Sequence, residues 1–215
     1  MMLQERITLL TGPSSEPVTE AEAMAHLRLD GEEELAQMHG AIRAARHAVE
    51  NWTGRALISQ SWRFMLDAWP GERGSAWWDG TRPGPVGGSA ARFIEMPKPP
   101  LISVQQVLLF NDAGEPVVFD AANYFVDAAS APGRLALRNS AAAPAPQRPV
   151  NGLQIDFTCG YGAAPGDLPP PLRQAVLMLT AHYFEHREVL RGPGDGPMLP
   201  LGLVAALAPY RVVRL

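Results

Sequence analysis

The clearest periodic stretch of the chain is Leu35 to Gly54, LAQMHGAIRAARHAVENWTG. Its apolar residues follow one another in steps of three and four, which is the spacing of one face of an α-helix. They are Leu35, Met38, Ile42, Ala45, Val49 and Trp52. Arg43, Arg46, His47 and Glu50 fall outside this stripe, and Gly54 is a typical C-terminal stop. The stretch predicts a helix with one buried face, which other elements of the chain must cover.

Two further helices are predicted, one on each side of this stretch in the sequence. Thr19 and Glu22 form an S/T-x-x-E capping box, which predicts a short helix over residues 21–29. The prolines at 169–171 open a longer helix, because proline is tolerated where the first amides of a helix have no partner. Its apolar stripe is Leu172, Val176, Leu179, Tyr183, His186 and Leu190, and Gly192-Pro193 ends it.

Between these helices the period changes to two, which is typical of strands. Strands are predicted around Trp62–Leu66, Phe93–Met96, Ile102–Phe110, Val117–Phe119, Tyr124–Val126, Arg134–Leu137 and Leu153–Cys159. Asn111–Gly114 is a hairpin turn between two of them. The Gly/Pro-rich segment 70–91, which contains Trp77 and Trp78, is predicted to be a projecting loop.

This order of elements predicts an α+β fold with four segments. Residues 1–57 and 163–191 would form one helical module from the N-terminal helices and the long C-terminal helix, with a β-rich insertion at residues 58–162. Residues 192–215 would be a hinge and an extended C-terminal tail.

Composition narrows the classes of function. The formal net charge is −4, Lys98 is the only lysine, and there is no dense basic stretch, so tight nucleic-acid binding is not expected. No apolar run approaches the roughly 20 residues of a membrane helix, and the N-terminus lacks a secretory apolar region. The single cysteine, Cys159, fits a reducing compartment and a small buried strand residue.

One motif has the pattern of an enzyme. His182, Glu185 and His186 match H-x-x-E-H, in which two histidines one helical turn apart bind zinc and the glutamate activates water. A zinc hydrolase is therefore an alternative, although only Glu188 and Asp195 follow as acidic candidates for a third ligand. The other interpretation is that His186 is an ordinary partly buried histidine and that Glu185 belongs to a solvated or intersubunit charge network. No cofactor is expected. Trp77 and Trp78 would either stack on a sugar or a base, or pack on a neighbouring subunit.

The C-terminal stretch Leu199 to Leu215, LPLGLVAALAPYRVVRL, follows a Gly/Pro-rich hinge and is too apolar for a free tail. We therefore expect it to be buried in a neighbouring copy or a partner protein. Its predicted docking residues are Leu201, Leu203, Val204, Leu207, Tyr210, Arg211, Val212, Val213, Arg214 and Leu215.

Several stretches together resemble the head–tail connector (adaptor, or head-completion) proteins of long-tailed bacteriophages and of phage-derived gene transfer agents. They are residues 48–58, 97–104, 124–127, 157–162, 168–179 and 207–211. The resemblance implies a structural ring, usually twelvefold, which lies in the particle neck under the portal protein. This ring would assemble in the host cytoplasm. Such a ring extends the DNA channel without sequence-specific binding and carries the stopper or tail-terminator proteins. The C-terminal tail would reach the portal, and no catalytic residues are implied.

Overall fold

The structure is a computed structural model that describes residues 6–29, 34–70, 93–185 and 201–212. The chain forms two compact units, each built from separate segments of sequence. We call Met1–Thr11 with Ser61–Cys159 the sheet unit, and Gly12–Gln60 with Gly160–Leu215 the helical unit. None of the described helices is long and apolar enough to cross a membrane.

The larger sheet of the sheet unit has five strands in the order β1-β2-β8-β4-β5. They are β1 (Ile7–Thr11), β2 (Gln60–Leu66), β4 (Leu101–Phe110), β5 (Pro116–Val118) and β8 (Leu153–Cys159). The pairs β1–β2, β4–β5 and β4–β8 are antiparallel. The predicted hairpin of β4 and β5 is confirmed, whereas β1 lies before the first element that the sequence predicted.

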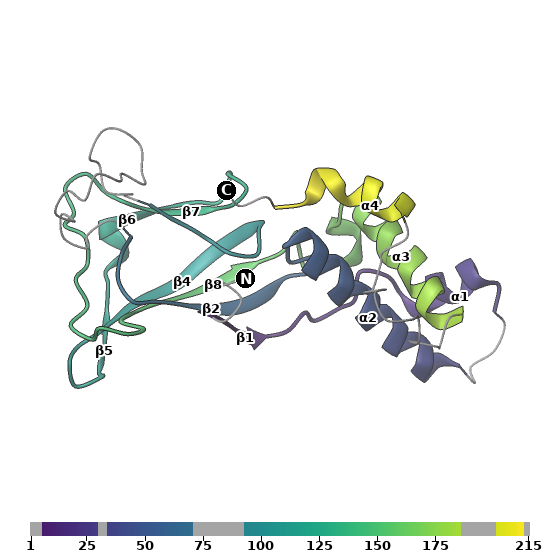
Figure 1. Ribbon diagram of the computed structural model, residues 1–215, viewed down its shortest axis with the longest axis horizontal. Coiled ribbons are helices and arrows are strands. Elements are labelled where there is room, and N and C mark those ends of the chain that lie inside the picture. The colour runs from purple at the N-terminus through teal and green to yellow at the C-terminus, as the bar shows by residue number, and fades with distance from the viewer. Residues whose placement is uncertain (1–5, 30–33, 71–92, 186–200, 213–215) are drawn as a thin grey trace, which may run out of the picture. The chain divides into compact units, whose positions relative to one another are not determined.

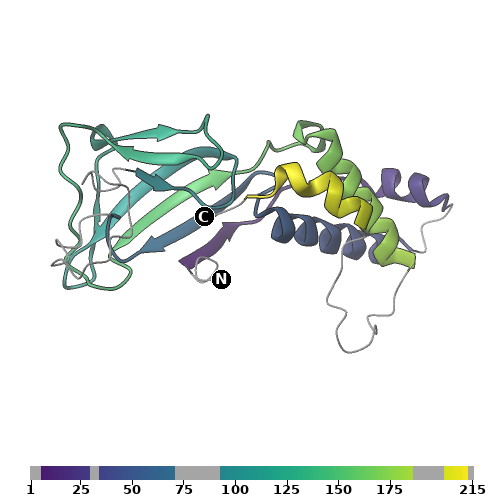
Figure 2. The same cartoon turned by 45° about the horizontal axis from the view of Figure 1, so that its top comes forward.

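The smaller sheet has three antiparallel strands in the order β3-β7-β6. They are β3 (Phe93–Glu95), β6 (Tyr124–Asp127) and β7 (Arg134–Leu137), and the 3₁₀ turn η2 (Ala121–Asn123) leads into β6. Figures 1 and 2 show this sheet lying over one face of the larger one. Ile94 and Leu135 are buried on its inner face, whereas Phe93 and Phe125 are exposed.

The central strand β8 has two different faces. Its apolar side chains alternate along the strand and are fully buried; they are Leu153, Ile155, Phe157 and Cys159. Burial of Cys159 in a strand confirms the structural interpretation of that residue. On the opposite face, Asp156 accepts hydrogen bonds from Arg63, Gln106 and Gln154. Burial alone would raise the pKa of Asp156, but these hydrogen bonds outweigh it and lower the pKa.

The helical unit contains α1 (Glu20–Leu27), α2 (Leu35–Thr53), α3 (Pro170–Glu185) and α4 (Leu201–Leu207), with the 3₁₀ turns η3 (Pro165–Asp167) and η4 (Ala208–Tyr210). Thr19 and Glu22 form the predicted capping box. Gly54 ends α2 in the left-handed conformation, as predicted, with φ of 73°. The described part of α3 begins at the predicted prolines, and the expected helix end at Gly192 lies outside the described residues.

The core of the helical unit lies between α2 and α3, which are neighbours in both ribbon views (Figures 1 and 2). It includes the predicted stripe residues Met38, Ile42, Ala45, Val49, Leu172, Val176 and Leu179. Residues 57–59 and 160–162 run alongside each other, because Tyr161 N–H donates to Leu57 O and Ser59 N–H donates to Gly162 O.

The helices and the two antiparallel sheets confirm the predicted α+β class. The predicted loop with Trp77 and Trp78 lies outside the described residues.

Candidate docking segment and helical groove

The described part of the C-terminal segment is not extended, contrary to the prediction. Leu201–Leu207 form α4 and Ala208–Tyr210 continue as η4. Leu203 is 2% exposed and Leu207 is fully buried in the core of the helical unit. The expectation that these two leucines need another protein for burial is thus wrong. The physical reason is that leucines at i and i+4 share one helix face, and α3 provides an apolar surface for it.

Three contacts hold the end of this segment against the C-terminus of α2. Val212 N–H donates a 2.8 Å hydrogen bond to Thr53 O, and Arg55 Nε donates a 2.6 Å hydrogen bond to Tyr210 O. The guanidinium of Arg211 lies 5.5 Å from the centre of the Trp52 ring. A side chain at Gly54 would lie 3.5 Å from the Val212 side chain. The segment is therefore anchored through the main chain up to Val212.

The remaining predicted docking residues differ in accessibility. Arg211 is exposed, whereas Val204, Tyr210 and Val212 are partly exposed. The side chain of Leu201 and residues Val213, Arg214 and Leu215 lie outside the described part of the structure. A docking function can therefore use the outer face of this segment and its terminal residues, but not the two core leucines.

A buried ionic network connects α2 to two other segments of the helical unit. Arg46 Nε donates to Glu16 Oε2 at 2.8 Å, and Arg46 Nη1 donates to Glu50 Oε2 at 3.0 Å. Glu50 Oε1 also accepts hydrogen bonds from Leu57 N–H at 3.0 Å and from the Gln60 amide at 2.5 Å. Arg46 is 3% and Glu50 is 4% exposed. The network joins the N-terminal segment, α2 and the crossover toward β2.

Arg46 and Glu50 lie outside the apolar stripe that the sequence predicts to be buried, so the periodicity did not predict this network. The apolar period identifies only the side of α2 that faces α3, while Glu16 and the 57–60 crossover contact Arg46 and Glu50 on another side. The i, i+4 spacing of Arg46 and Glu50 was the available signal, but it is equally typical of an exposed pair.

The enzyme-like motif is only partly described. His182 is partly exposed, with its ring 6.0 Å from the ring of Tyr183, and Glu185, the last described residue of α3, is exposed. His186, the other proposed zinc ligand, lies outside the described residues. Within the described ranges, no group of three or more His, Cys, Asp or Glu side chains is placed to hold a metal ion.

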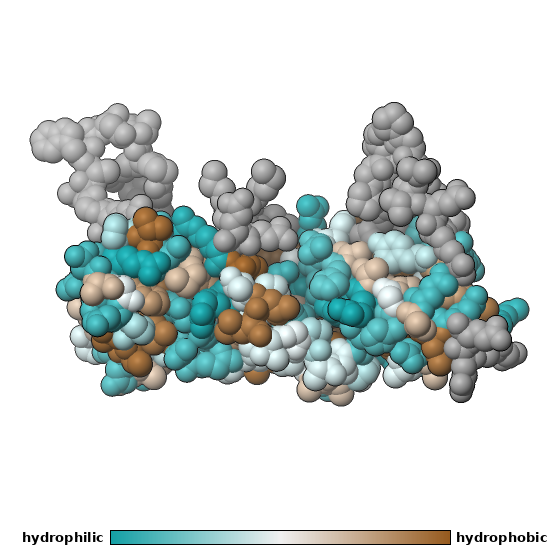
Figure 3. Space-filling view, turned by 90° about the horizontal axis from the view of Figure 1, so that it is seen from below, coloured by the Kyte–Doolittle hydropathy of each residue, from teal (hydrophilic) through white to brown (hydrophobic). Residues whose placement is uncertain are grey.

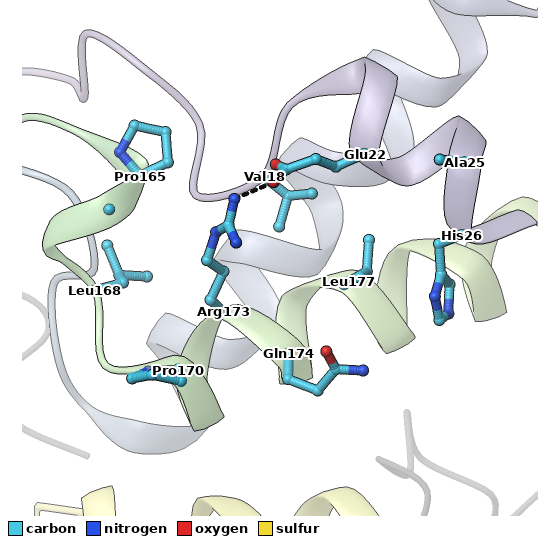
Figure 4. A pocket seen from close by; sticks show the side chains of 11 residues that line it. Val18, Glu22, Ala25, His26, Pro165, Leu168, Pro170, Arg173, Gln174 and Leu177 are labelled. Atoms are coloured by element: carbon cyan, nitrogen blue, oxygen red, sulfur yellow. Dashed lines mark hydrogen bonds and ion pairs between the residues drawn. The ribbon is translucent and has the colours of Figure 1, made fainter.

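A groove of about 640 Å³ lies between α1 and the first half of α3. Val18, Leu168 and Leu177 give it an apolar lining. Figure 4 shows Arg173 extending from α3 to Glu22 on α1, where the two form an ion pair. The backbone amide of Thr19 and this guanidinium both lower the pKa of Glu22. Because the two charges neutralise each other, the groove suits an apolar group better than an anion.

The comparisons with known proteins identify solved relatives along nearly the whole chain. No protein-family model and no curated protein matches it. A chain from the neck of an empty gene transfer agent particle, solved with C6 symmetry, is 30% identical, with a TM-score of 0.73. That match covers 97% of this chain and 96% of the other.

Two further matches come from native particles. A chain from the neck of the native particle, solved with C12 symmetry, is also 30% identical, with a TM-score of 0.68 and the same coverage. A chain from the virion of the native particle is 28% identical, with a TM-score of 0.73, over 100% of this chain and 97% of that one. With 30% identity to the two neck chains over 97% of this chain and 96% of theirs, the chain belongs to the head–tail connector family of phage-like gene transfer agent particles.

Proposed function

We propose that the chain is a structural component of the neck of a gene transfer agent or related phage-like particle. It forms a ring under the portal protein, extends the DNA channel and provides the platform for the stopper or tail-terminator proteins. The observation that carries this proposal is the 30% identity to neck chains over 96–97% of both sequences. The C6 and C12 symmetries of those necks support a homo-oligomeric ring, and we propose twelve copies.

The proposed role is mechanical and needs no catalytic step. The relatives that carry the proposal are particle components, and this origin favours neither the zinc hydrolase nor the carbohydrate-binding alternative. A formal net charge of −4 without a dense basic stretch suits a channel through which DNA slides without strong attachment.

We further propose that the C-terminal end contacts the portal. The packing of Leu203 and Leu207 in the core of their own unit limits the docking surface to the outer side of α4 and the residues from Tyr210 onward. The anchorage of Val212 on Thr53 would then hold the start of the final residues at a defined point of each copy. Arg211 and Arg214 would pair with portal carboxylates and set the register of the two rings.

The experiment is a pair of truncations of the full chain, measured as copies of the protein bound per purified portal ring. Removal of residues 213–215 should strongly reduce portal binding and leave the helix content unchanged, because the described core keeps all its residues. Removal of residues 199–215 should also lower the stability of the helical unit, since it removes Leu203 and Leu207.

Portal binding is also measured for the Arg211→Ala variant. Arg43→Ala is its matched control, since both arginines are exposed on the helical unit. Normal portal binding by the chain that lacks residues 213–215 and also carries Arg211→Ala would refute the docking proposal. Imaging that located the chain away from the particle neck would refute the proposed function itself.

A further inference from the structure

The two central helices of the helical unit each have an outer face, on the side away from their shared core. The core lies between α2 and α3, and the exposed residues of each helix lie on its opposite side. On the face of the molecule shown in Figure 3, hydrophobic residues form small separate clusters among hydrophilic ones. Of the large hydrophobic side chains that are exposed in the described ranges, Met178 on α3 is the only one that belongs to the helical unit.

The outer face of α3 combines this methionine with an unpaired negative charge. Gln174, Met178 and Glu185 are exposed and lie on one side of the helix, and Met178 is 44% exposed. Glu185 follows Met178 by two helical turns, about 10 Å along the axis. Its carboxylate forms no hydrogen bond or ion pair with another residue of the described ranges. The face thus presents an apolar side chain and, two turns further on, an available carboxylate.

The outer face of α2 has the opposite charge. Its exposed residues are Ala36, His39, Gly40, Arg43, Ala44, His47 and Asn51. The only carboxylate of α2 belongs to Glu50, which is buried and paired with Arg46. The guanidinium of Arg43 has no hydrogen bond or ion pair within the described part of the chain, whereas His39 already contacts Glu20. This face therefore has an available cation and no exposed anion of its own.

The two helices run in opposite directions. Helix α2 ends at Thr53, shortly before residues 57–59, and α3 begins at Pro170, shortly after residues 160–162. Because these two segments are hydrogen-bonded to each other, the end of α2 and the start of α3 lie at the same end of the helical unit, as both ribbon views show (Figures 1 and 2). The helices are therefore antiparallel, and their outer faces point to opposite sides of the pair.

We propose that the outer face of α3 in one copy packs on the outer face of α2 in the next copy around the ring. This inference rests on the proposed function, because a closed ring requires a contact between two unlike faces of the same chain. Neighbours in a twelvefold ring are related by a rotation of about 30°, so α2 of one copy stays nearly antiparallel to α3 of the next. Such a crossing angle is close to one that packed helices prefer.

The antiparallel direction sets the register of this contact. Ala44, His47, Ala48 and Asn51 are the four residues of α2 that surround one gap on its surface, and two of them are small. With Met178 of the next copy in this gap, Glu185 of that copy lies about 10 Å nearer the start of α2, within one turn of Arg43. The ion pair would fix the register, whereas the apolar packing would hold the contact, so Arg43→Ala alone should leave the ring intact.

The test is disulfide formation in intact particles with the variant that carries both Ala44→Cys and Met178→Cys. The natural Cys159 is buried and should not react. Mild oxidation should link the copies into a ladder longer than a dimer, because each copy contacts one neighbour with each face. The control pairs Met178→Cys with Ala36→Cys, which lies about 12 Å from Ala44 along α2 and should give no ladder. The single-cysteine variants should give none either.

A second variant tests whether the gap on α2 must stay open. Ala44→Trp fills it and should reduce the number of copies retained per particle by about tenfold or more. Ala21→Trp, at an exposed site of α1, is the matched control and should retain the normal number. Because both alanines are exposed, the isolated variants should keep the helix content of the wild-type chain.

The outcomes separate this inference from the proposed function. A wild-type chain that is present in the neck would overturn the inference alone if the Ala44/Met178 variant gave no ladder or only dimers. A ladder from the Ala36/Met178 control, or normal retention of Ala44→Trp, would do the same. A wild-type chain absent from the neck would instead refute the proposed function.

Discussion

Arg46 donates a 3.0 Å hydrogen bond from Nη1 to Glu50, one turn further along α2, and both side chains are buried. Glu16 contacts the same guanidinium from the N-terminal segment, and Glu50 also binds the crossover at Leu57 and Gln60. One cation therefore serves two carboxylates that come from segments far apart in the sequence. Buried charged groups cost free energy to desolvate. Removal of one partner leaves an uncompensated buried charge, which strongly destabilises the folded state.

Loss of Arg46 should destabilise the helical unit strongly. Arg46→Met leaves Glu16 and Glu50 without their shared cation, and we expect a loss of about 3–5 kcal/mol in the free energy of unfolding. Urea denaturation followed by the circular dichroism of the helices measures this loss. Arg43→Met, at an exposed site of the same helix, should change stability by less than about 0.5 kcal/mol. Equal effects of the two substitutions would contradict the buried network.

Leu207 should contribute to stability although it lies in the segment that the sequence assigned to a partner. It is fully buried, so Leu207→Ala should cost about 2–5 kcal/mol through lost apolar contacts and a cavity. Met178→Ala, at a 44% exposed site of α3, is the control and should cost far less. The comparison uses the isolated chain at low concentration. If Leu207→Ala has no effect there, α4 does not pack on its own unit.

Acid should weaken the turn between β6 and β7. Hydrogen bonds from the Ser130 hydroxyl, Arg134 and the Ser130 amide lower the pKa of Asp127 from 3.8 to about 2. Because the folded-state pKa lies below the unfolded value, the stabilisation is present above pH 3.8 and is lost as the pH falls toward about 2.

An NMR titration of the Asp127 carboxyl group measures this pKa directly. Ser130→Ala should raise it toward 3.8, since it removes the hydroxyl donor at 2.7 Å. Ser140→Ala, at an exposed site beyond β7, should leave it unchanged. An Asp127 pKa near 3.8 in the wild-type chain would show that the turn is not formed in solution.

Two glycines should respond to alanine with opposite signs. Gly160 has a φ of 128°, and an added Cβ would lie 2.6 Å from the main chain of Ile58, so Gly160→Ala should cost more than about 2 kcal/mol. Gly40 lies inside α2 with open space around it, and Gly40→Ala should stabilise the helix by about 0.5–1 kcal/mol. Thermal unfolding of both variants measures the two shifts. Stabilisation by Gly160→Ala would refute the close approach of the two segments.

The sequence predicted the caps and turns that depend on residues close together in the chain. The Thr19–Glu22 capping box, the Gly54 stop and the Asn111–Gly114 turn all depend on hydrogen bonds or backbone angles within a few positions. Strands β7 and β8 were also predicted with their observed bounds, because the alternation of apolar residues is a local signal as well. Strand β1 was missed, because only its pairing with β2, more than 50 residues later, shows that Ile7–Thr11 is a strand.

The sequence by itself determined the α+β class, the apolar stripes of α2 and α3, and the resemblance to head–tail connectors, because each is written in local periodicity or in residue order. Only the tertiary structure decided where the C-terminal apolar residues are buried and which charges lie inside. Burial depends on which distant segments meet. Leu203 and Leu207 pack on an apolar surface of their own chain. Arg46 and Glu50 are buried because two other segments of the chain pack against α2.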